Sequence, residues 1–215
     1  EYYPDVDDTA VVAMALHRTR NKAYEPALQR ASEWIIGMQS RNGGWAAFDA
    51  DNEYHLLENM PFADHGALLD PPSADVSARC ISFLTQMGYD QTHLTIKRGG
   101  EYLKRNQELN GSGFGRWGNN YIYGTWSVLS SIKLIEFEQK DYIQQKAIKY
   151  IKGNQRLDGG WGEDGETYFS KNLNSTKTST PSQTAWAVLG LISAGELNSN
   201  EVSHGINYLI ENYSE

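Results

Sequence analysis

The sequence predicts an all-α fold built from helical hairpins, either an α/α toroid or a solenoid. Two observations carry this prediction. Apolar residues recur at helical spacing in eight segments, and no segment alternates convincingly between apolar and polar residues as a half-buried strand does. A short pattern containing Gln, Gly and Trp also recurs along the chain, and such self-similarity is typical of repeat architectures.

The eight predicted helices follow one another with loops between them. The first begins after Pro4-Asp5 and places Ala10 and Met14 on its apolar side. The other seven are predicted over 26–39, 73–87, 92–107, 120–136, 141–153, 181–194 and 199–212. Segments 49–72 and 157–180 are predicted as long loops. Loops above about 12–15 residues inside a compact domain tend to be functional or disordered.

The repeated pattern consists of an aromatic residue, a Gln five residues later, and a Trp six residues after the Gln. The complete copies are Trp34-Gln39-Trp45 and Tyr150-Gln155-Trp161, and the partial ones are Tyr102-Gln107-Gly113, without Trp, and Tyr208, where Tyr213 stands in place of Gln. A Gly-Gly pair precedes each Trp and suits a tight turn after a helix. We therefore expect each Trp to fold back, cover the helix end and stack on the Gln amide.

Composition excludes several classes of function. The 215 residues contain 19 Lys and Arg against 27 Asp and Glu, a net charge of −8, which argues against nucleic acid or an anionic membrane as the partner of a basic face. The single Cys permits neither an internal disulfide nor a Cys-rich zinc site, and we expect no metal and no cofactor. The sequence shows no transmembrane run and no signal peptide, so a soluble, cytoplasmic chain is expected.

Several stretches resemble the triterpene cyclases, which are class II terpene cyclases. The repeats resemble the QW motifs of that family, and DVDDTA (residues 5–10) resembles its DxDDTA acid motif. Three further stretches are similar to squalene–hopene cyclases: DPPSADVSA (70–78), FGRWGNNYIYGT (114–125) and STPSQTAWA (179–187). The resemblance covers essentially the whole chain, and the full set of motifs is far more specific than DVDDTA alone.

The resemblance implies that residues 1–215 form a single domain that is an incomplete (α/α)6 barrel. The chain starts just ahead of the acid motif and stops inside the fourth repeat, so we expect a fragment that is inactive alone. The expected partners are an apolar polyprene substrate and the second barrel domain of the parent chain, which carries the membrane-contacting helices. The resemblance further implies a parent enzyme that binds the membrane peripherally, and it is compatible with a homodimer.

The aspartates of DVDDTA are the candidate catalytic acids. Asp5, Asp7 and Asp8 lie at a predicted helix start, where Asp5 is the natural cap and the others face the positive end of the helix dipole. Three carboxyl groups this close cannot all ionise freely, so a shared proton is expected. The resemblance assigns Asp7 as the proton donor to a terminal alkene, with Asp5 and Asp8 as helpers. The alternative is an Asp-rich helix start with no catalytic role.

Aromatic side chains are the candidate substrate contacts, because an aromatic face stabilises a carbocation without reacting with it. The resemblance places Phe48, Trp117 and Tyr123 near the substrate or the acid, and Phe62 and Ala63 at a constriction of the entry channel. Ordinary core packing is the alternative for each aromatic residue.

Arg79 departs from the squalene–hopene cyclase pattern, which has His four residues after the aspartate that matches Asp75. A permanently charged guanidinium would stabilise the Asp7 anion, but it cannot relay a proton. Reprotonation would then come from water, with Tyr123 as the conduit. The alternative is that Arg79 pairs with Asp75 at i, i+4, or with Asp70, and touches no catalytic acid.

The substrate and the reaction class stay open at this level. Phe48 and Arg79 leave both squalene and a C35 polyprene, as in the sporulenol synthase-like branch, as candidate substrates. An (α/α) glycoside hydrolase would instead use two carboxylates, for which Asp7 with Asp49 or Asp164 are candidates. A toroid that only binds a partner is the third possibility.

Overall fold

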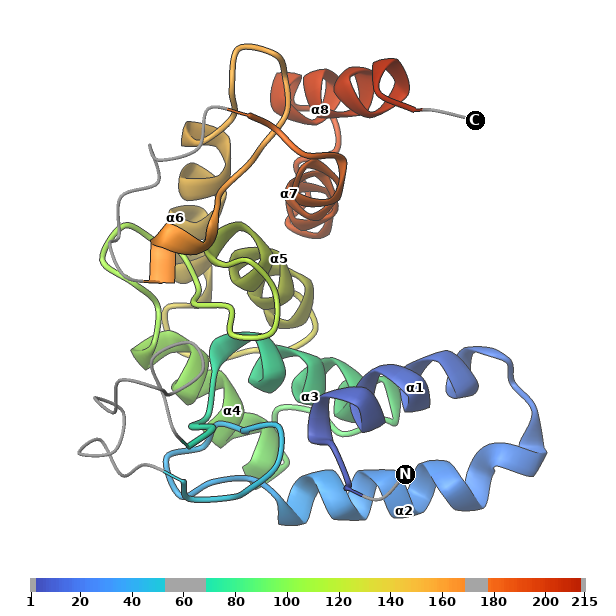
Figure 1. Ribbon diagram of the computed structural model, residues 1–215. Helices are drawn as coiled ribbons and strands as arrows, with labels where there is room; N and C mark the ends of the chain where they lie inside the picture. Colours follow the sequence, from blue (N-terminus) through green and yellow to red (C-terminus); the bar gives the residue numbers. More distant parts are fainter. Residues whose placement is uncertain (1–2, 53–68, 169–177, 214–215) are drawn as a thin grey trace. The chain divides into compact units, whose positions relative to one another are not determined.

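The computed structural model describes residues 3–52, 69–168 and 178–213, and its regular secondary structure is helical (Figure 1). The helices are α1 (Val6–Arg18), α2 (Glu25–Gly37), α3 (Ala74–Gln86), α4 (Leu94–Arg105), α5 (Tyr121–Ile132), α6 (Lys140–Gly153), α7 (Pro181–Ser193) and α8 (Asn200–Glu211), with 3-10 turns η1 (Lys22–Tyr24) and η4 (Gly165–Tyr168). All eight predicted helices are confirmed, with ends that shift by at most four residues. Within the described ranges, the nearest approach to a sheet is an isolated bridge between Trp45 and Ser73.

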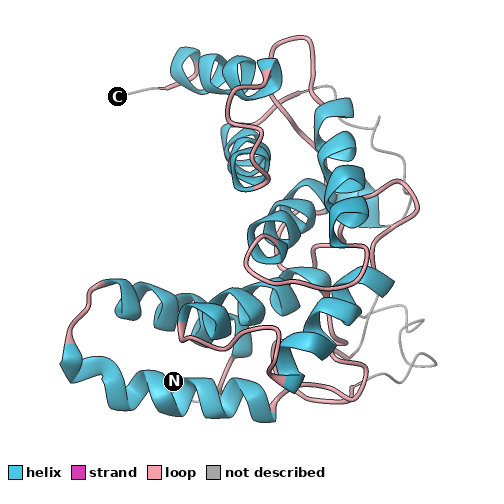
Figure 2. Ribbon diagram, turned by 180° about the vertical axis from the view of Figure 1, so that it is seen from behind, coloured by secondary structure: helices cyan, strands magenta, loops and turns pink. Residues whose placement is uncertain are grey.

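The helices fall into two compact units. Residues 1–105 and 134–137 form the first unit, and residues 106–133 and 138–215 form the second. In the first unit α1 packs on α2 and α3, and α3 packs on α4; in the second α5 packs on α6 and α7, and α7 packs on α8 (Figure 2). Within each unit the two odd-numbered helices therefore pack on each other, and each even-numbered helix packs on the one before it. This pairing confirms the predicted α/α class, whereas the single domain over residues 1–215 stays a prediction.

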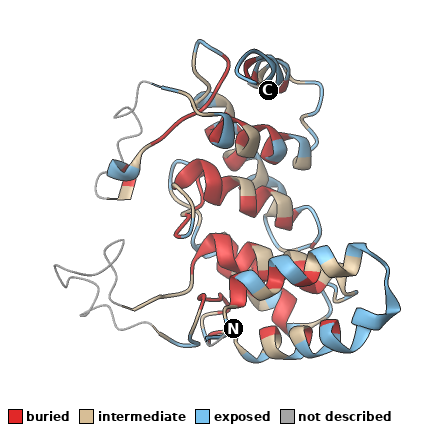
Figure 3. Ribbon diagram, turned by 45° about the vertical axis from the view of Figure 1, so that its right-hand side comes forward, coloured by how far each residue is buried: buried red, intermediate tan, exposed pale blue. Residues whose placement is uncertain are grey.

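Burial separates the helices that form the core from those that cover it (Figure 3). α3 and α5 are buried along most of their length, whereas α2 and α8 bury one face. The core positions include small polar residues such as Ser77 and Thr125, which are fully buried. Trp45 and Trp161 are also fully buried, each against the core of its own unit. None of the described helices combines the length and apolar character needed to cross a bilayer.

Each Gln of the repeat fastens its own turn to the second helix that follows it in the chain. Gln39 Nε2 donates to the main-chain oxygens of Gly43 and Thr95, at 2.9 Å each. The same two bonds form from Gln107 to Gly111 and Ile143, and from Gln155 to Gly159 and Glu201. The distant acceptors Thr95, Ile143 and Glu201 lie in the first turns of α4, α6 and α8, respectively. The repeat is therefore a structural joint between the turn that carries the Gln and the even-numbered helix that comes later in the chain.

The tryptophans of the repeat cover helix ends, as predicted. Trp45 Nε1 donates to the carbonyl of Ile35 at 2.7 Å, and Trp161 Nε1 donates to that of Ile151 at 2.8 Å. Both acceptors lie near the end of a helix, where carbonyl groups lack intrahelical partners. The expected stacking of Trp on the Gln amide stays a prediction.

The third copy keeps the turn but not the Trp, for a steric reason. Gly113 occupies the Trp position and lies directly against α5, where its added Cβ would stand 3.2 Å from the main-chain oxygen of Gly124. Its main-chain N–H still donates to Thr125 Oγ1, just as Trp45 N–H donates to Ser77 Oγ. The turn after Gln107 thus keeps the hydrogen bonds of the other copies, although no Trp covers the helix end.

Candidate active site

The start of α1 separates the three aspartates by burial. Asp5 caps the helix by accepting the main-chain N–H of Asp8 at 2.8 Å, as predicted. Asp8 is exposed, whereas Asp7 is 8% exposed and points into the first unit. Helix geometry explains this difference, because successive residues in the first turn face different directions. Only Asp7 of the three is therefore buried.

Arg79 of α3 forms an ion pair with Asp7, donating from Nη1 to Oδ2. Both side chains are largely covered, with exposed fractions of 22% and 12%. The contact excludes the alternative in which Arg79 touches no acid of the DVDD cluster. The other oxygen of Asp7, Oδ1, is buried and has no hydrogen-bond partner within the part of the chain that the structure describes.

The protonation of Asp7 reflects two opposing effects. Burial raises its pKa to about 6, and this is the largest influence. The Arg79 guanidinium lowers the pKa, while the charges of Asp75 and Asp5 raise it further. Burial, rather than crowding among the three aspartates, is therefore the main reason that Asp7 holds a proton more firmly than a solvated aspartate.

Two loops hold the start of α1 in place. Val6 N–H donates to the carbonyl of Ala47 at 2.7 Å, and Ala47 N–H donates to Asp70 Oδ2 at 2.5 Å. The same segment bonds to the start of α3, because Ser73 N–H donates to the carbonyl of Trp45 at 3.1 Å. Phe48 follows Ala47 directly and makes an edge contact with Tyr3, with ring centroids 5.5 Å apart. The first repeat turn thus connects the start of α1, the start of α3 and a candidate aromatic contact.

Asp75 is fully buried in the first turn of α3 and accepts a hydrogen bond from Ser73 Oγ at 2.5 Å. Its charge is among the influences that raise the pKa of Asp7. Asp75 therefore influences Asp7 through its charge, whereas Arg79 forms the hydrogen bond and ion pair with Asp7.

Comparison with known proteins identifies the family. The chain matches the squalene-hopene cyclase C-terminal domain over residues 1–215. The chain belongs to this family. It is 51% identical to a squalene–hopene cyclase of Zymomonas mobilis, over 100% of this chain and 34% of that protein. It is 54% identical to a squalene–hopene cyclase of Schizosaccharomyces japonicus, over 100% of this chain and 33% of that protein. The chain spans about a third of the length of these curated relatives.

Solved structures confirm the fold. The type II terpene cyclase MstE from Scytonema, in its apo form, matches with a TM-score of 0.69 at 19% identity, over 98% of this chain and 56% of that one. The ent-copalyl diphosphate synthase from Streptomyces platensis matches with a TM-score of 0.68 at 19% identity, over 98% of this chain and 36% of that one. These matches support the predicted toroid class for this squalene-hopene cyclase family member.

The second unit of this family member carries the remaining aromatic candidates that the structure describes. Tyr123 is buried at the third position of α5, and Trp117 is 45% exposed in the preceding loop. The ring of Tyr123 lies 5.1 Å from that of Trp186 and 5.9 Å from that of Trp126. Trp126 and Trp186 are themselves stacked, with centroids 6.1 Å apart. Phe62 and Ala63 lie outside the described residues.

Sequence reasoning missed several members of this second cluster. Trp126, Trp186, Asn120 and Gln183 lie in or beside the two stretches that resemble the cyclase family, yet none was singled out as a candidate. Glu163 was also missed, although it follows the second complete repeat by two residues. Their position in or beside the matched motifs could have singled them out. Their contacts could not be predicted, because these join residues far apart in the sequence.

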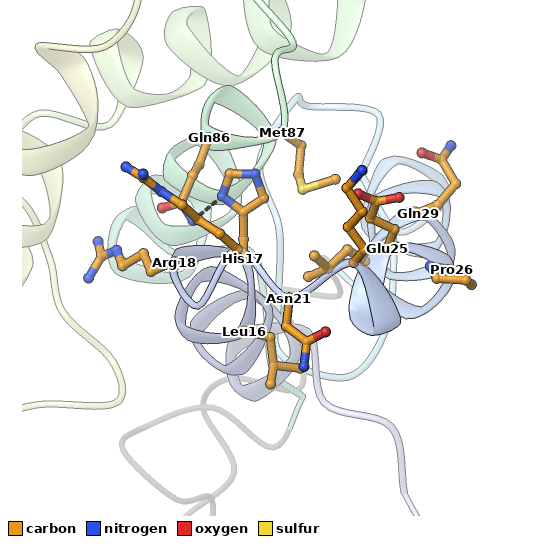
Figure 4. A pocket seen from close by; sticks show the side chains of 12 residues that line it. Leu16, His17, Arg18, Asn21, Glu25, Pro26, Gln29, Gln86 and Met87 are labelled. Carbon is orange, nitrogen blue, oxygen red and sulfur yellow. Dashed lines mark hydrogen bonds between the residues drawn. The ribbon is translucent and has the colours of Figure 1, made fainter.

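A separate cavity of about 870 Å³ lies in the first unit at the other end of α1 (Figure 4). It is bordered by the ends of α1 and α3 and the start of α2, where Gln86 Nε2 lies 2.9 Å from His17 Nδ1. α1 has 13 residues, which separates this cavity from Asp7 by more than about 10 Å along the helix at 1.5 Å per residue. None of the predicted site residues lines it. This cavity is therefore not the acid site.

Proposed function

We propose that this chain is the acid-bearing part of a longer squalene–hopene cyclase-like enzyme, which protonates a terminal alkene and starts cationic polycyclisation. The observation that carries this proposal is the environment of Asp7. One of its oxygens is paired with Arg79, and the other is buried without a partner among the described residues. A carboxylic acid with this arrangement offers its proton from Oδ1 while Oδ2 keeps the arginine.

The proton transfer balances on these groups. The π electrons of the terminal alkene form a new C–H bond with the Oδ1 proton, and the electrons of the O–H bond remain on Asp7 as a carboxylate. The positive charge develops on the more substituted alkene carbon. Arg79 stabilises the carboxylate as it forms, because an opposite charge nearby favours the ionised state. Asp5 holds the helix start and Asp75 adds a negative potential that keeps the proton on Asp7 before transfer.

Aromatic rings then stabilise the cation, at about 0.5–2 kcal/mol for each contact. We assign this role to Phe48 and Trp117, and we assign to Phe62 and Ala63 the narrowing of the substrate channel. Arginine does not relay protons at working pH, so water restores the acid, with Tyr123 as its conduit. The roles of these residues follow from the family resemblance.

We assign squalene as the substrate, because the relatives that match this chain at about half identity are named squalene–hopene cyclases. A C35 polyprene is the competing substrate, motivated by Phe48 and Arg79 in place of the family's usual residues. The full-length cyclase would take either one from a bilayer as a peripheral membrane protein. The glycoside hydrolase and binding-only interpretations lose their basis, since the chain belongs to a cyclase family.

The test is product analysis of the full-length cyclase that carries this chain. Supplied with squalene or a C35 polyprene, the wild-type enzyme should yield polycyclic products from squalene, separated by gas chromatography and mass spectrometry. Asp7→Asn should lower turnover by at least about 10³-fold, because the amide has no acidic proton to donate, and should leave the far-UV spectrum unchanged.

The matched control is Asp141→Asn. Asp141 occupies the second position of α6, as Asp7 does in α1, but its side chain is exposed. It should retain full activity. Substantial activity in Asp7→Asn would show that another group donates the proton. If the wild-type enzyme converted only the C35 polyprene, that polyprene would be the substrate in place of squalene.

A further inference from the structure

The start of α5 is capped by a side chain from a distant loop. Its N-cap residue, Asn120, makes no capping bond with its own side chain. The main-chain N–H groups of Asn120 and Ile122 instead donate to Glu163 Oε1, at 2.5 and 2.7 Å. Free N–H groups at a helix start favour a carboxylate, both as hydrogen-bond acceptor and as the negative partner of the helix dipole. Glu163 therefore supplies the cap that the sequence around α5 lacks.

The segment that carries Glu163 is itself held firmly. Glu163 N–H donates to Gln183 Oε1 at 2.9 Å, and Gln183 Nε2 returns a bond to the Glu163 carbonyl at 2.8 Å. Gln183 lies in the first turn of α7 and also donates to the Asn119 carbonyl at 3.3 Å. The starts of α5 and α7 and the loop after Trp161 thus form one bonded assembly within the second unit.

This assembly fixes the aromatic residues that the proposed mechanism uses. Tyr123 comes directly after Ile122, whose N–H binds Glu163, and its ring rests against Trp186 of α7. The loop with Trp117 folds closely around that ring, because Cβ atoms added at Gly115 or Gly118 would stand 2.6 Å from it. A shift in the start of α5 would therefore move Tyr123 and Trp117 together.

The two oxygens of Glu163 have different surroundings. Oε1 accepts the two N–H groups, whereas Oε2 is buried without a hydrogen-bond partner within the described ranges. Burial raises the pKa of Glu163 to about 7, although the main-chain N–H donors oppose this rise. A neutral acid with its proton on Oε2, or a Gln in its place, would leave the acceptor at Oε1 intact. The acceptor and the charge can therefore be separated by substitution.

We propose that Glu163 is a positioning residue of the cyclase, which acts through its Oε1 acceptor to hold the start of α5 and thereby to orient Tyr123 and Trp117. This inference rests on the proposed function for its catalytic consequence. Its structural consequence, the fixed cluster of Tyr123, Trp126 and Trp186, does not depend on the substrate. Glu163 is distinct from the acid machinery of the first unit.

Two variants of the full-length cyclase test the inference. Glu163→Ala removes the acceptor, and we expect turnover of squalene per folded molecule to fall about 10- to 100-fold, as displacement by about 1 Å can produce. Glu163→Gln keeps an acceptor of the same shape and should stay within about twofold of wild type. Near-UV circular dichroism should report the loss of fixed aromatic packing in Glu163→Ala and its retention in Glu163→Gln. Glu166→Ala, an exposed position in the same loop, is the matched control and should change neither measurement.

The outcomes separate this inference from the proposed function. A wild-type enzyme that does not cyclise squalene would contradict the proposed function, while the near-UV comparison would still decide whether Glu163 positions the cluster. An unchanged near-UV spectrum in Glu163→Ala, or unchanged turnover per folded molecule despite a lower melting temperature, would overturn the inference. A Glu163→Gln variant as impaired as Glu163→Ala would also overturn it, because the charge rather than the acceptor would then be required.

Discussion

At the scale of single residues, the balance between burial and charge at Asp7 governs what this site can do. An acid that protonates an alkene must hold its proton at working pH and yet form a stable anion once the proton has left. Burial meets the first requirement by raising the pKa of Asp7 to about 6, and Arg79 meets the second. Because protonated Asp7 is the active form, activity should fall as pH rises above about 6.

Arg79→Gln tests this balance in the full-length cyclase. Gln can still donate a hydrogen bond to Asp7, but the substitution removes the positive charge that lowers the pKa of Asp7. An opposite charge at this range typically lowers a carboxyl pKa by about 1–3 units, so the alkaline limb of kcat/KM should move upward by about that amount. The maximal rate should fall by up to about tenfold for each pKa unit, since a weaker acid transfers its proton less readily.

The control for this prediction is Arg79→Lys, which keeps a positive charge and should leave the alkaline limb close to its wild-type position. The measurement is kcat/KM from about pH 4 to 9 for the three proteins. An alkaline limb that does not move in Arg79→Gln would mean that the titrating group is not Asp7.

Sequence reasoning predicted the residues of this site better than their pairings. The cap by Asp5 was predictable because it joins residues three positions apart. The ion pair of Asp7 with Arg79 joins residues 72 positions apart, and the sequence alone left pairing of Arg79 with Asp75 or Asp70 as the alternative. Glu163 was missed for the same reason, because its partners on α5 lie 41 and 43 positions earlier. Spacing reveals contacts within a turn of helix, whereas only tertiary packing decides the longer ones.

At the scale of the element, the repeat turn shows why this chain uses glycine after Gln. Gly43 has φ of +94°, and an added Cβ would overlap the main-chain carbonyl of Arg98 on α4. Gly111 and Gly159 repeat the positive φ, at +96° and +84°, with α6 and α8 as their neighbours. The prediction of a Gly turn in the two complete copies is confirmed, and the third copy has the same turn at Gly111. The closeness of the next helix was not predictable, because it depends on how the hairpins pack.

Gly43→Ala should therefore destabilise the fold substantially. The left-handed backbone costs a non-glycine residue about 1–2 kcal/mol, and the overlap with the Arg98 carbonyl adds to this cost because main chain cannot move aside. We expect the free energy of unfolding to fall by at least about 2 kcal/mol, measured by urea denaturation of the full-length cyclase.

Gly37→Ala is the matched control. Gly37 ends α2, six residues before Gly43, and an added Cβ there meets nothing within 4 Å. Its substitution should stabilise the protein by up to about 1 kcal/mol, since Ala favours a helix more than Gly does. Equal effects at the two positions would show that the turn does not require glycine.

At the scale of the whole molecule, each unit leaves apolar side chains in contact with solvent. On α1, Val11 and Val12 are 42% and 56% exposed, and on α8, Ile206 and Ile210 are 40% and 68% exposed. Larger exposed apolar patches commonly mark interaction sites. The chain spans about a third of its relatives' length, and we propose that the remainder of the full-length cyclase covers these faces.

The 215 residues expressed alone should therefore be inactive on squalene and should bind a hydrophobic dye more strongly than the full-length cyclase.

Val12→Lys and Ile210→Lys test whether these faces are covered, because their effects on stability should differ between the isolated chain and the full-length cyclase. In the isolated chain each Lys should change stability by less than about 0.5 kcal/mol, as is usual on a surface. In the full-length cyclase each should cost more than about 2 kcal/mol, because it buries an unpaired charge. Leu157→Lys, at an exposed turn, serves as the control and should be neutral in both proteins. Neutral effects of all three in the full-length cyclase, or turnover of squalene by the isolated chain, would show that these faces need no cover.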